Sequence, residues 1–417
     1  MKSCRILLCY ISVILISFLS VNCNTDKVEP NNPDQSLLHL NNIDNLNELI
    51  ATIEQTADSE LQLKMANELW DSLVAQKRIP WISNDTIIFL YKGSGSSVHF
   101  VGDMTGWGIK EDYLATKIGN STIWYLLKTF PTDARIDYKV VTNGSNWTMD
   151  PNNPKQQLSG FGYNSAFSMP EYDSSVYLVE NLNIAKGTLS EAQLISSSNL
   201  GHNVRYWVYT PTGYTNLSNL STIYVADGQE YKQKGMGSMV TVLDNLIAAN
   251  LINPVIAVFV DPVNPATSQN QRAELFLNNV NYADFFAQEL VPFIDANYKT
   301  NPDALSRAIL GTSYGGNNAT WFGYQIPETF KLIASQSPAF QSNVLTLYSN
   351  SATLGMSKFF ITTGVINDTE LYADQLEQIL ISKGVPYKYM KVNEGHSWGN
   401  WSALLDEMLV YFFSNGK

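Results

Sequence analysis

Short apolar runs alternate with longer segments of helical character throughout the second half of the sequence, and this alternation constrains the fold more than any other feature. The runs rich in β-branched and aromatic residues are 205–210, 221–226, 254–261, 307–311, 332–335, 358–363 and 387–392. Helical segments, among them 238–249, 282–298 and 370–383, lie between them. A chain in which strands and helices alternate folds into a mostly parallel sheet with helices on both faces. We therefore predict that residues 173–417 form an α/β domain.

A different pattern precedes this region. Residues 86–91, 97–101, 122–127 and 134–141 are short runs rich in aromatic and β-branched residues, and Gly, Asn and Asp separate them. Such runs are typical of antiparallel strands joined by turns. We predict a small immunoglobulin-like β-sandwich over residues 81–172.

Two amphipathic helices are expected ahead of the sandwich, within residues 36–80. Apolar residues recur there at helical spacing, at positions 43, 46, 50 and 53 and again at 61, 65, 69 and 73. Residues 24–35 are polar and contain two prolines, a composition typical of a linker.

The first residues are typical of an export signal. Basic residues precede an apolar run over residues 6–21 that is short and polar at its edges. The run leads to Cys23 in a setting similar to the lipobox of bacterial lipoproteins, although Asn22 stands where that pattern prefers a small residue. We predict that residues 1–23 are a signal peptide of the lipoprotein type and that Cys23 carries the lipid. A plain cleaved signal peptide is the alternative.

This leader predicts a location outside the cytoplasm. The protein would cross the inner membrane and remain in the periplasm or on the outer membrane, with the lipid as its one membrane anchor. The formal net charge of -12 and the sequence pI of about 4.8 argue against nucleic-acid binding, because phosphate contacts require clustered Lys and Arg.

The few cysteines and histidines limit the chemistry further. The three cysteines stand at positions 4, 9 and 23, so the part of the chain after the leader has no thiol for catalysis or for metal binding. The four histidines are scattered at positions 39, 99, 202 and 396. We expect neither a metal ion nor an organic cofactor.

The motif with the clearest chemical meaning is Gly-Thr-Ser-Tyr-Gly-Gly at 311–316, a GxSxG pattern between a predicted strand and a predicted helix. A strand, a sharp turn and a helix in that order form the nucleophile elbow of α/β-hydrolases. Gly311 and Gly315 let neighbouring backbone pass close to a serine in an unfavourable conformation. We predict Ser313 as the nucleophile.

A serine nucleophile requires a base and an orienting acid, which in α/β-hydrolases follow in the order Ser, acid, His. His396 is the one histidine after Ser313, and it follows the predicted strand 387–392. The acid should lie after the strand 358–363, where Asp368 is the favoured candidate. Glu370 and Asp374 remain alternatives.

The developing oxyanion needs hydrogen-bond donors. The backbone N–H of Tyr314, next to the nucleophile, is one candidate. The backbone N–H of Gln229, in the loop after the strand 221–226, is the other. Asp227, in the same loop, is expected to be structural.

Several of these features together resemble a known esterase family. From Asn203 onward the chain is similar to the family that includes enterochelin esterases, feruloyl and acetylxylan esterases and mycolyltransferases. The matching features are Asp227-Gly228, Arg272 with Glu274, the elbow at 311–316, Ser335-Gln336-Ser337, and Gly395-His396 with Trp398. The resemblance implies an α/β-hydrolase domain over residues 173–417 that hydrolyses carboxylic esters without a cofactor. Arg272 and Glu274 would pair to shape the site or form an ordinary surface ion pair.

Residues 81–172 resemble the early-set domain of isoamylase type. The similar segments are 98–104 with Trp107, and 137–141 followed by Trp147 and the Asp-Pro-Asn-Asn-Pro run at 150–154. Relatives of this module bind α-glucans in some proteins and cover an active site in others. The order of the two modules resembles enterochelin-esterase-like proteins.

Three functions remain open at this point. The first is hydrolysis of polysaccharide-linked feruloyl or acetyl esters, or of siderophore esters of enterochelin type. The second is acyl transfer with the same residues. The third is noncatalytic glycan binding by Trp107, Trp124 and Trp147. A peptidase of prolyl-oligopeptidase type fits the elbow, but the chain is too short for that family's propeller.

Overall fold

The structure, a computed structural model, describes residues 45–352 and 354–415. The predicted signal peptide at 1–23, with Cys23, and the predicted linker at 24–35 lie outside the described residues. Residues Asp44–Lys417 form one unit. Within the described part of the chain, no helix has both the length and the apolar character needed to cross a membrane.

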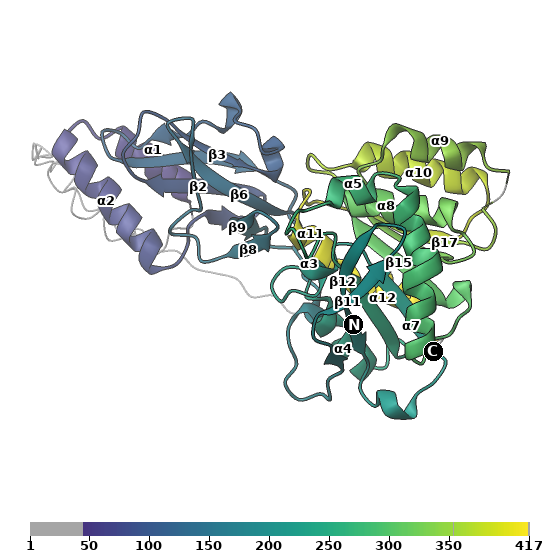
Figure 1. Cartoon of the computed structure of the whole chain (residues 1–417). Coiled ribbons are helices and arrows are strands. Elements are labelled where there is room, and N and C mark those ends of the chain that lie inside the picture. The colour runs from purple at the N-terminus through teal and green to yellow at the C-terminus, as the bar shows by residue number, and fades with distance from the viewer. Residues whose placement is uncertain (1–44, 353, 416–417) are drawn as a thin grey trace, which may run out of the picture. The chain divides into compact units, whose positions relative to one another are not determined.

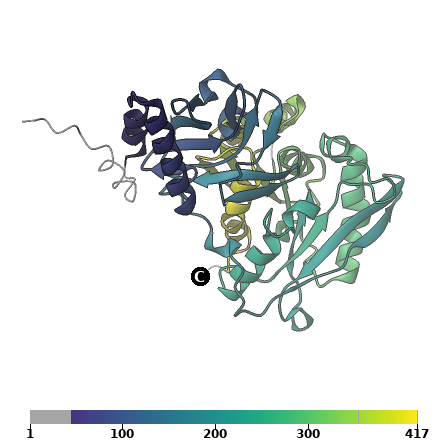
Figure 2. The same ribbon diagram turned by 90° about the vertical axis from the view of Figure 1, so that its left-hand side faces the viewer.

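The two amphipathic helices predicted near the N-terminus are present as α1 (Leu46–Glu54) and α2 (Ser59–Ala75). Each begins at a side-chain cap. Asn45 accepts a hydrogen bond from the N–H of Glu48, and Asp58 accepts hydrogen bonds from the N–H groups of Glu60 and Leu61. Their apolar stripes are buried. The helices contact each other, and α2 contacts a neighbouring strand, β5 (Ile123–Thr129) (Figures 1 and 2).

Two antiparallel sheets follow. One has the order β1-β2-β5-β4 and the other β3-β6-β9-β8, with β7 paired to β6. The remaining strands are β1 (Trp81–Ser83), β2 (Thr86–Lys92), β3 (Val98–Gly102), β4 (Thr116–Lys117), β6 (Arg135–Thr142), β7 (Asn146–Thr148), β8 (Gln156–Ser159) and β9 (Gly162–Ser168). Phe89 of β2 stacks on Phe100 of β3 with ring centroids 4.8 Å apart, so the sheets share one core. The four predicted strand runs correspond to β2, β3, β5 and β6.

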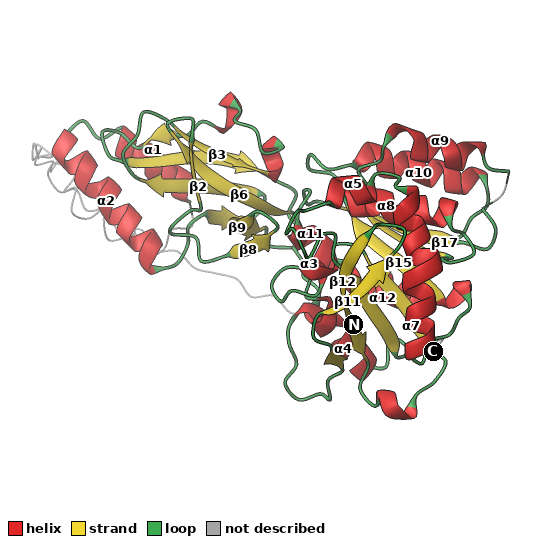
Figure 3. Cartoon of the chain, viewed as in Figure 1, coloured by secondary structure: helices red, strands yellow, loops and turns green. Residues whose placement is uncertain are grey.

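The third sheet has nine strands among the described residues, in the order β10-β12-β14-β13-β15-β16-β17-β18, with β11 paired to β12. Figure 3 draws its strands in yellow and labels β11, β12, β15 and β17. Its strands are β10 (Thr188–Leu189), β11 (Gln193–Ser197), β12 (His202–Thr210), β13 (Ser221–Val225), β14 (Val255–Val260), β15 (Arg307–Thr312), β16 (Leu332–Gln336), β17 (Lys358–Gly364) and β18 (Tyr387–Val392). The strands from β14 to β18 are parallel, whereas β10, β11 and β12 pair antiparallel. The seven strands predicted here are all present, which confirms a mostly parallel sheet.

Helices cover both faces of this sheet. They are α3 (Gly228–Tyr231), α4 (Met239–Ala248), α5 (Arg272–Phe276), α6 (Val280–Asp284), the π-helix η7 (Phe285–Leu290), α7 (Val291–Asn297), α8 (Tyr314–Gln325), α9 (Ser342–Asn350), α10 (Glu370–Ser382), α11 (Trp398–Ala403) and α12 (Leu405–Phe413). Short 3-10 turns occur at Asp103–Thr105, Glu111–Tyr113, Val176–Leu178, Tyr214–Asn216 and Ala304–Ser306.

The helix predicted at 282–298 is divided into α6, η7 and α7. Pro292 stands at the start of α7. A proline has no N–H, and its ring clashes with the carbonyl of the residue four positions earlier. A π turn before the proline relieves that clash, which explains the interruption.

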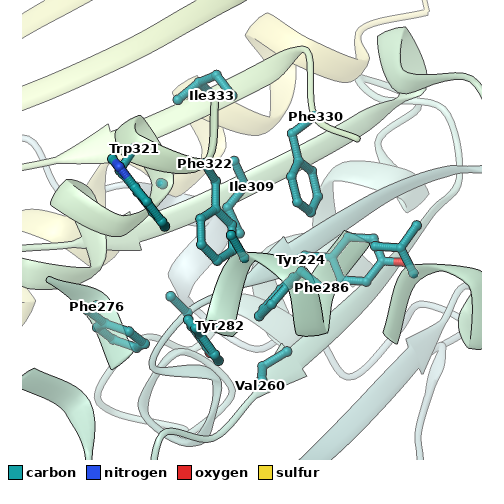
Figure 4. Close-up of a cluster of buried hydrophobic side chains, with 14 of the residues drawn as sticks. Tyr224, Val260, Phe276, Tyr282, Phe286, Ile309, Trp321, Phe322, Phe330 and Ile333 are labelled. Atoms are coloured by element: carbon teal, nitrogen blue, oxygen red, sulfur yellow. The ribbon is translucent and has the colours of Figure 1, made fainter. Parts of the chain in front are cut away.

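Side chains of the central strands alternate between two apolar cores. Tyr224 of β13 belongs to the core beneath α5, α8 and η7, whereas Ile223 and Val225 face the core beneath α4, α11 and α12. This alternation follows from the two-residue period of a strand. Figure 4 shows the first core, where Tyr224, Phe286, Phe322 and Phe330 pack together.

The order of the strands determines where a site can form. β13 lies between β14 and β15, so the chain moves to one side of β13 and then to the other. Loops that leave the carboxyl ends of adjacent strands diverge at such a point and leave room for a ligand. The loops after β13, β15, β17 and β18 carry the predicted site residues.

Candidate active site

Ser313 occupies a sharp turn between β15 and α8. Its φ is 58° and its ψ is -119°, a strained conformation for a residue with a side chain. A Cβ atom at Gly311 would overlap the backbone of Gly315, so glycine is required there. The N–H of Ser313 donates to the carbonyl of Gln336 at 3.0 Å, and its carbonyl accepts from Ala339 at 3.0 Å. These bonds hold the strained residue in place.

The structure brings Ser313, His396 and Asp368 together in a line. His396 Nε2 lies 2.9 Å from Ser313 Oγ, and His396 Nδ1 lies 2.6 Å from Asp368 Oδ1. Asp368 follows β17, and His396 follows β18. Both distances are those of hydrogen bonds. In such a line the serine O–H donates to Nε2 of the imidazole, and the imidazole Nδ1–H donates to the carboxylate.

Further donors hold Asp368 in its ionised form. Its Oδ2 accepts hydrogen bonds from Ser337 Oγ and from the N–H of Gly364, each at 2.6 Å, and its Oδ1 accepts from the N–H of Thr369 at 2.7 Å. Burial alone would raise the pKa of this carboxyl. The hydrogen bond and charge of His396, with the other donors, outweigh burial and lower the pKa below its ordinary value.

The alternative acids do not reach the histidine. Glu370 and Asp374 lie on α10, where both form ion pairs with Lys391, at 2.9 and 2.8 Å. Asp374 also accepts a hydrogen bond from Tyr389 at 2.6 Å. The geometry therefore favours Asp368 as the acid.

Two side chains that had no predicted role support this line. Trp401 packs its ring edge against His396, with centroids 4.9 Å apart at 87°, and its Nε1–H donates to Ser337 Oγ at 2.9 Å. Ser337 thus links the tryptophan to Asp368. Ser337 belongs to the Ser335–Ser337 run that contributed to the family resemblance. No motif singled out Trp401, because an aromatic residue in a helix is usually part of the core.

The two predicted oxyanion donors lie after adjacent strands. Tyr314 is the first residue of α8, and Gln229 lies in α3, after β13. β13 and β15 pair with Val225 opposite Leu310, so their carboxyl ends meet. Within the described part of the chain, neither backbone N–H donates to a carbonyl outside its own helix. Free N–H groups at helix N-termini attract negative charge.

Asp227, which was expected to be structural, is the ion-pair partner of Arg272. The Nε of Arg272 donates to both carboxylate oxygens of Asp227, at 2.8 and 2.9 Å, and an Nη donates to the carbonyl of Thr312 at 3.0 Å. The expected pair between Arg272 and Glu274 is wrong, because the end of β13 places Asp227 closer to the guanidinium. The ion pair ties the loop after β13 to the residue that precedes the nucleophile.

Glu230 is a half-buried acid near the site. Its Oε2 accepts a hydrogen bond from Trp398 Nε1 at 3.1 Å. Burial, together with the charge of Asp227, raises the pKa of Glu230 to about 7. The sequence did not indicate this raised pKa, because nothing in the local pattern distinguishes Glu230 from other residues of a helix.

The three tryptophans considered for glycan binding do not share one sheet. Trp124 is buried in β5, with its Nε1–H bonded to the carbonyl of Gly93 at 3.1 Å. Trp147 is 42% exposed on β7 of the other sheet. Trp107 donates its Nε1–H to Asp103 at 3.0 Å. Within residues 45–352 and 354–415, no three or more His, Cys, Asp or Glu side chains form a group that could hold a metal ion.

Comparison with known proteins gives consistent matches. A family model described as "Putative esterase" matches residues 197–412, more than half of the chain. The uncharacterized protein YjcH of Bacillus subtilis (strain 168) is 25% identical over 234 residues, which are 54% of this chain and 96% of YjcH. The crystal structure of the enterobactin esterase FES from Shigella flexneri in the presence of enterobactin has a TM-score of 0.66 at 18% identity, covering 78% of this chain and 92% of FES. The ferric enterobactin esterase of Salmonella typhimurium has a TM-score of 0.66 at 16% identity, covering 78% of this chain and 93% of that one.

Proposed function

This chain belongs to the esterase family whose model matches residues 197–412, and from that membership we propose that it hydrolyses carboxylic esters with Ser313 as the nucleophile. The observation that carries the proposal is the hydrogen-bonded line in which Nε2 of His396 stands 2.9 Å from Ser313 Oγ and its Nδ1 stands 2.6 Å from Asp368. A serine hydroxyl attacks a carbonyl effectively when a base is within hydrogen-bond reach.

The reaction begins when Ser313 Oγ attacks the ester carbonyl carbon. Nε2 of His396 takes the hydroxyl proton as the new C–O bond forms, and the ionised Asp368 stabilises the resulting imidazolium through Nδ1–H. The carbonyl oxygen becomes an oxyanion, which the N–H groups of Tyr314 and Gln229 bind. His396 then gives the proton to the leaving alcohol oxygen, which departs and leaves an acyl group on Ser313.

Water completes the cycle. His396 takes a proton from the water, the resulting hydroxide oxygen attacks the acyl carbon, and the same two N–H groups stabilise the second oxyanion. Ser313 Oγ recovers its proton from His396 as the acid is released. An acceptor alcohol in place of water would give acyl transfer, which is the alternative outcome of the same chemistry.

We infer that the substrate is an acyl ester of a polysaccharide, feruloyl or acetyl, or a siderophore ester of enterochelin type. Support for the second class comes from the likeness to the enterobactin esterases, which covers 78% of the chain and thus more of it than the family model matches. Support for the first class comes from the resemblance of the chain from Asn203 onward to a family that includes feruloyl and acetylxylan esterases.

A panel of acetyl, feruloyl and catecholate-lactone esters tests the function and separates the substrate classes. Wild-type protein should hydrolyse at least one class, and Ser313→Ala should lose that activity by a factor on the order of 10⁶. A fluorophosphonate probe should label wild type and leave Ser313→Ala unlabelled. Product analysis with an added sugar acceptor distinguishes hydrolysis from acyl transfer. An inactive wild type with an unlabelled Ser313 contradicts the proposal.

We also propose that the protein is exported and that Cys23 carries a lipid. The basic residues, apolar run and cysteine of residues 1–23 support this. Mass spectrometry of the mature N-terminus should find a lipid-modified cysteine as the first residue. An N-terminus at another residue without lipid contradicts the lipidation.

A further inference from the structure

The two antiparallel sheets that extend from β1 to β9, residues 81–168, are called the β region below. Strand β6 of this β region contacts the loop that carries His396. The backbone N–H of Arg135, the first residue of β6, donates to the carbonyl of Asn393 at 3.2 Å, and Arg135 and Glu394 form a parallel bridge. Asn393 also donates its side-chain amide to Asp133 at 2.7 Å. β6 and α11, the helix just after His396, lie in contact (Figure 1). Residues far apart in the sequence thus fix the backbone beside His396.

The loop that carries Asp368 is held by the same β region. Asn367 donates its side-chain amide to the carbonyl of Asp103 at 2.9 Å. The two loops also bond to each other, since Ile366 donates its N–H to the carbonyl of Glu394 at 3.1 Å. A Cβ atom at Gly395 would overlap the side chain of Asp103, so the β region fits closely against the loop. Both loops therefore rest on one surface.

The side chain of Arg135 is the centre of this contact. It is 7% exposed. Its Nη2 lies 3.0 Å from Asp137 and donates a hydrogen bond to Gln157 at 2.9 Å. Its Nη1 stands 3.8 Å from a carboxyl oxygen of Glu394, which is too far for a hydrogen bond. Gly399 of α11 packs directly on the guanidinium, where a Cβ atom would overlap it. One planar cation thus touches elements on both sides of His396.

We propose that Arg135 is a positioning residue for the esterase site: it holds the segment from Asn393 to Gly399 so that His396 stays within hydrogen-bond reach of Ser313. The inference rests on the proposed function. It implies that the β region helps to position the catalytic histidine. Lysine cannot replace the arginine fully, because an ammonium on a flexible stem does not match the planar fork that reaches Asp137, Gln157 and Glu394 at once.

The test compares Arg135→Gln with Arg307→Gln. Arg307 is also buried, at 4% exposed, and also pairs with one aspartate, Asp295, at 2.8 Å. It begins β15, whereas Ser313 follows that strand's other end, roughly 20 Å away at the usual rise per residue. Both variants lose a buried arginine ion pair, but only Arg135 touches the segment around His396.

We expect Arg135→Gln to lower kcat by about 10-fold to 100-fold with KM nearly unchanged, because a displacement of about 1 Å at a catalytic group has effects of that size. Fluorophosphonate labelling of Ser313 should slow by the same factor. Arg135→Lys should fall between wild type and Arg135→Gln. Arg307→Gln should keep the wild-type kcat per folded molecule.

A folded Arg135→Gln with the kcat and labelling rate of Arg307→Gln overturns the proposal. Where Arg135→Gln does not fold, Arg135→Lys decides in the same way: an unchanged kcat overturns the proposal and a reduced kcat supports it. Failure of the proposed function is visible separately, because the wild type itself would then neither hydrolyse the ester panel nor label at Ser313, and the inference would fall with it.

Discussion

Asp368→Asn is the substitution whose effect the structure defines best. The carboxylate receives fixed backbone donors on both oxygens: the N–H of Gly364 on Oδ2 at 2.6 Å and the N–H of Thr369 on Oδ1 at 2.7 Å. An asparagine has one acceptor oxygen and one amide donor in place of the two oxygens. Whichever way it lies, its NH₂ group faces one of these N–H groups. Each orientation leaves a buried donor unpaired, at a cost of about 1–3 kcal/mol in stability.

The catalytic loss is larger than the loss of stability. With the amide nitrogen at the Oδ1 position, the side chain donates to His396 Nδ1 and forces the imidazole into the tautomer whose Nε2 already holds a proton. Nε2 can then no longer accept the proton of Ser313. In either orientation the negative charge that stabilises the imidazolium is gone. A triad that loses its carboxylate in this way loses about 10⁴-fold in kcat, which is about 5 kcal/mol of transition-state stabilisation.

The assay is steady-state hydrolysis of an aryl ester at neutral pH, with fluorophosphonate labelling and urea unfolding on the same samples. Asp374→Asn is the matched control, because Asp374 is the nearby carboxylate that binds Lys391 and not His396. We expect Asp374→Asn to keep the wild-type kcat. A folded Asp368→Asn that keeps more than about one tenth of the wild-type kcat, a loss of no more than about 1.4 kcal/mol, contradicts this role of Asp368.

Three further predictions follow from the site. Burial raises the pKa of Glu394 from its ordinary 4.5 to about 7, so the folded protein keeps a proton that the unfolded chain releases, and wild-type stability should fall as pH rises from about 4.5 to 7. Glu230, whose pKa is also raised to about 7, contributes to the same decline. Urea unfolding of Glu394→Gln should therefore show a decline that is smaller than in wild type by up to about 3 kcal/mol. An equal decline in Glu394→Gln contradicts the assignment. Gly399→Ala should lose about 1–3 kcal/mol of stability, because the new methyl overlaps Arg135, whereas Gly108→Ala, whose nearest atom is 3.8 Å away, should unfold like wild type. Trp401→Phe keeps an aromatic edge beside His396 but removes the 2.9 Å hydrogen bond to Ser337. Its kcat should fall about 10-fold with unchanged KM, as expected for one lost hydrogen bond. A wild-type kcat would show that Ser337 needs no such partner.

The sequence identified most of the C-terminal sheet because buried parallel strands are continuous apolar runs between helices. It missed β10 and β11, which are short strands whose residues are largely exposed. These edge strands lack the apolar character that marks the central ones. The division of the helix at 282–298 was also missed, since apolar spacing alone does not distinguish a π turn from an α-helix.

The candidate site was predicted to a similar degree. Ser313, Asp368 and His396 were found from a motif, a chain order and the ends of predicted strands, which are local features. The partner of Arg272 was predicted wrongly, because Glu274 is near in sequence whereas Asp227 is near in space. Glu230 and Trp401 carried no signal, since their importance comes from their neighbours in the fold.

The sequence by itself determined the strand and helix alternation, the strained Ser313 turn and the order of the candidate residues, because each depends on side-chain periodicity or on a few adjacent residues. The tertiary structure alone decided which acid meets His396 and that Arg135 of β6 lies against Glu394, a contact between residues far apart along the chain. Such contacts depend on how strands are ordered in the sheets and on what burial does to a charge. Neither property is written in the local pattern of the chain.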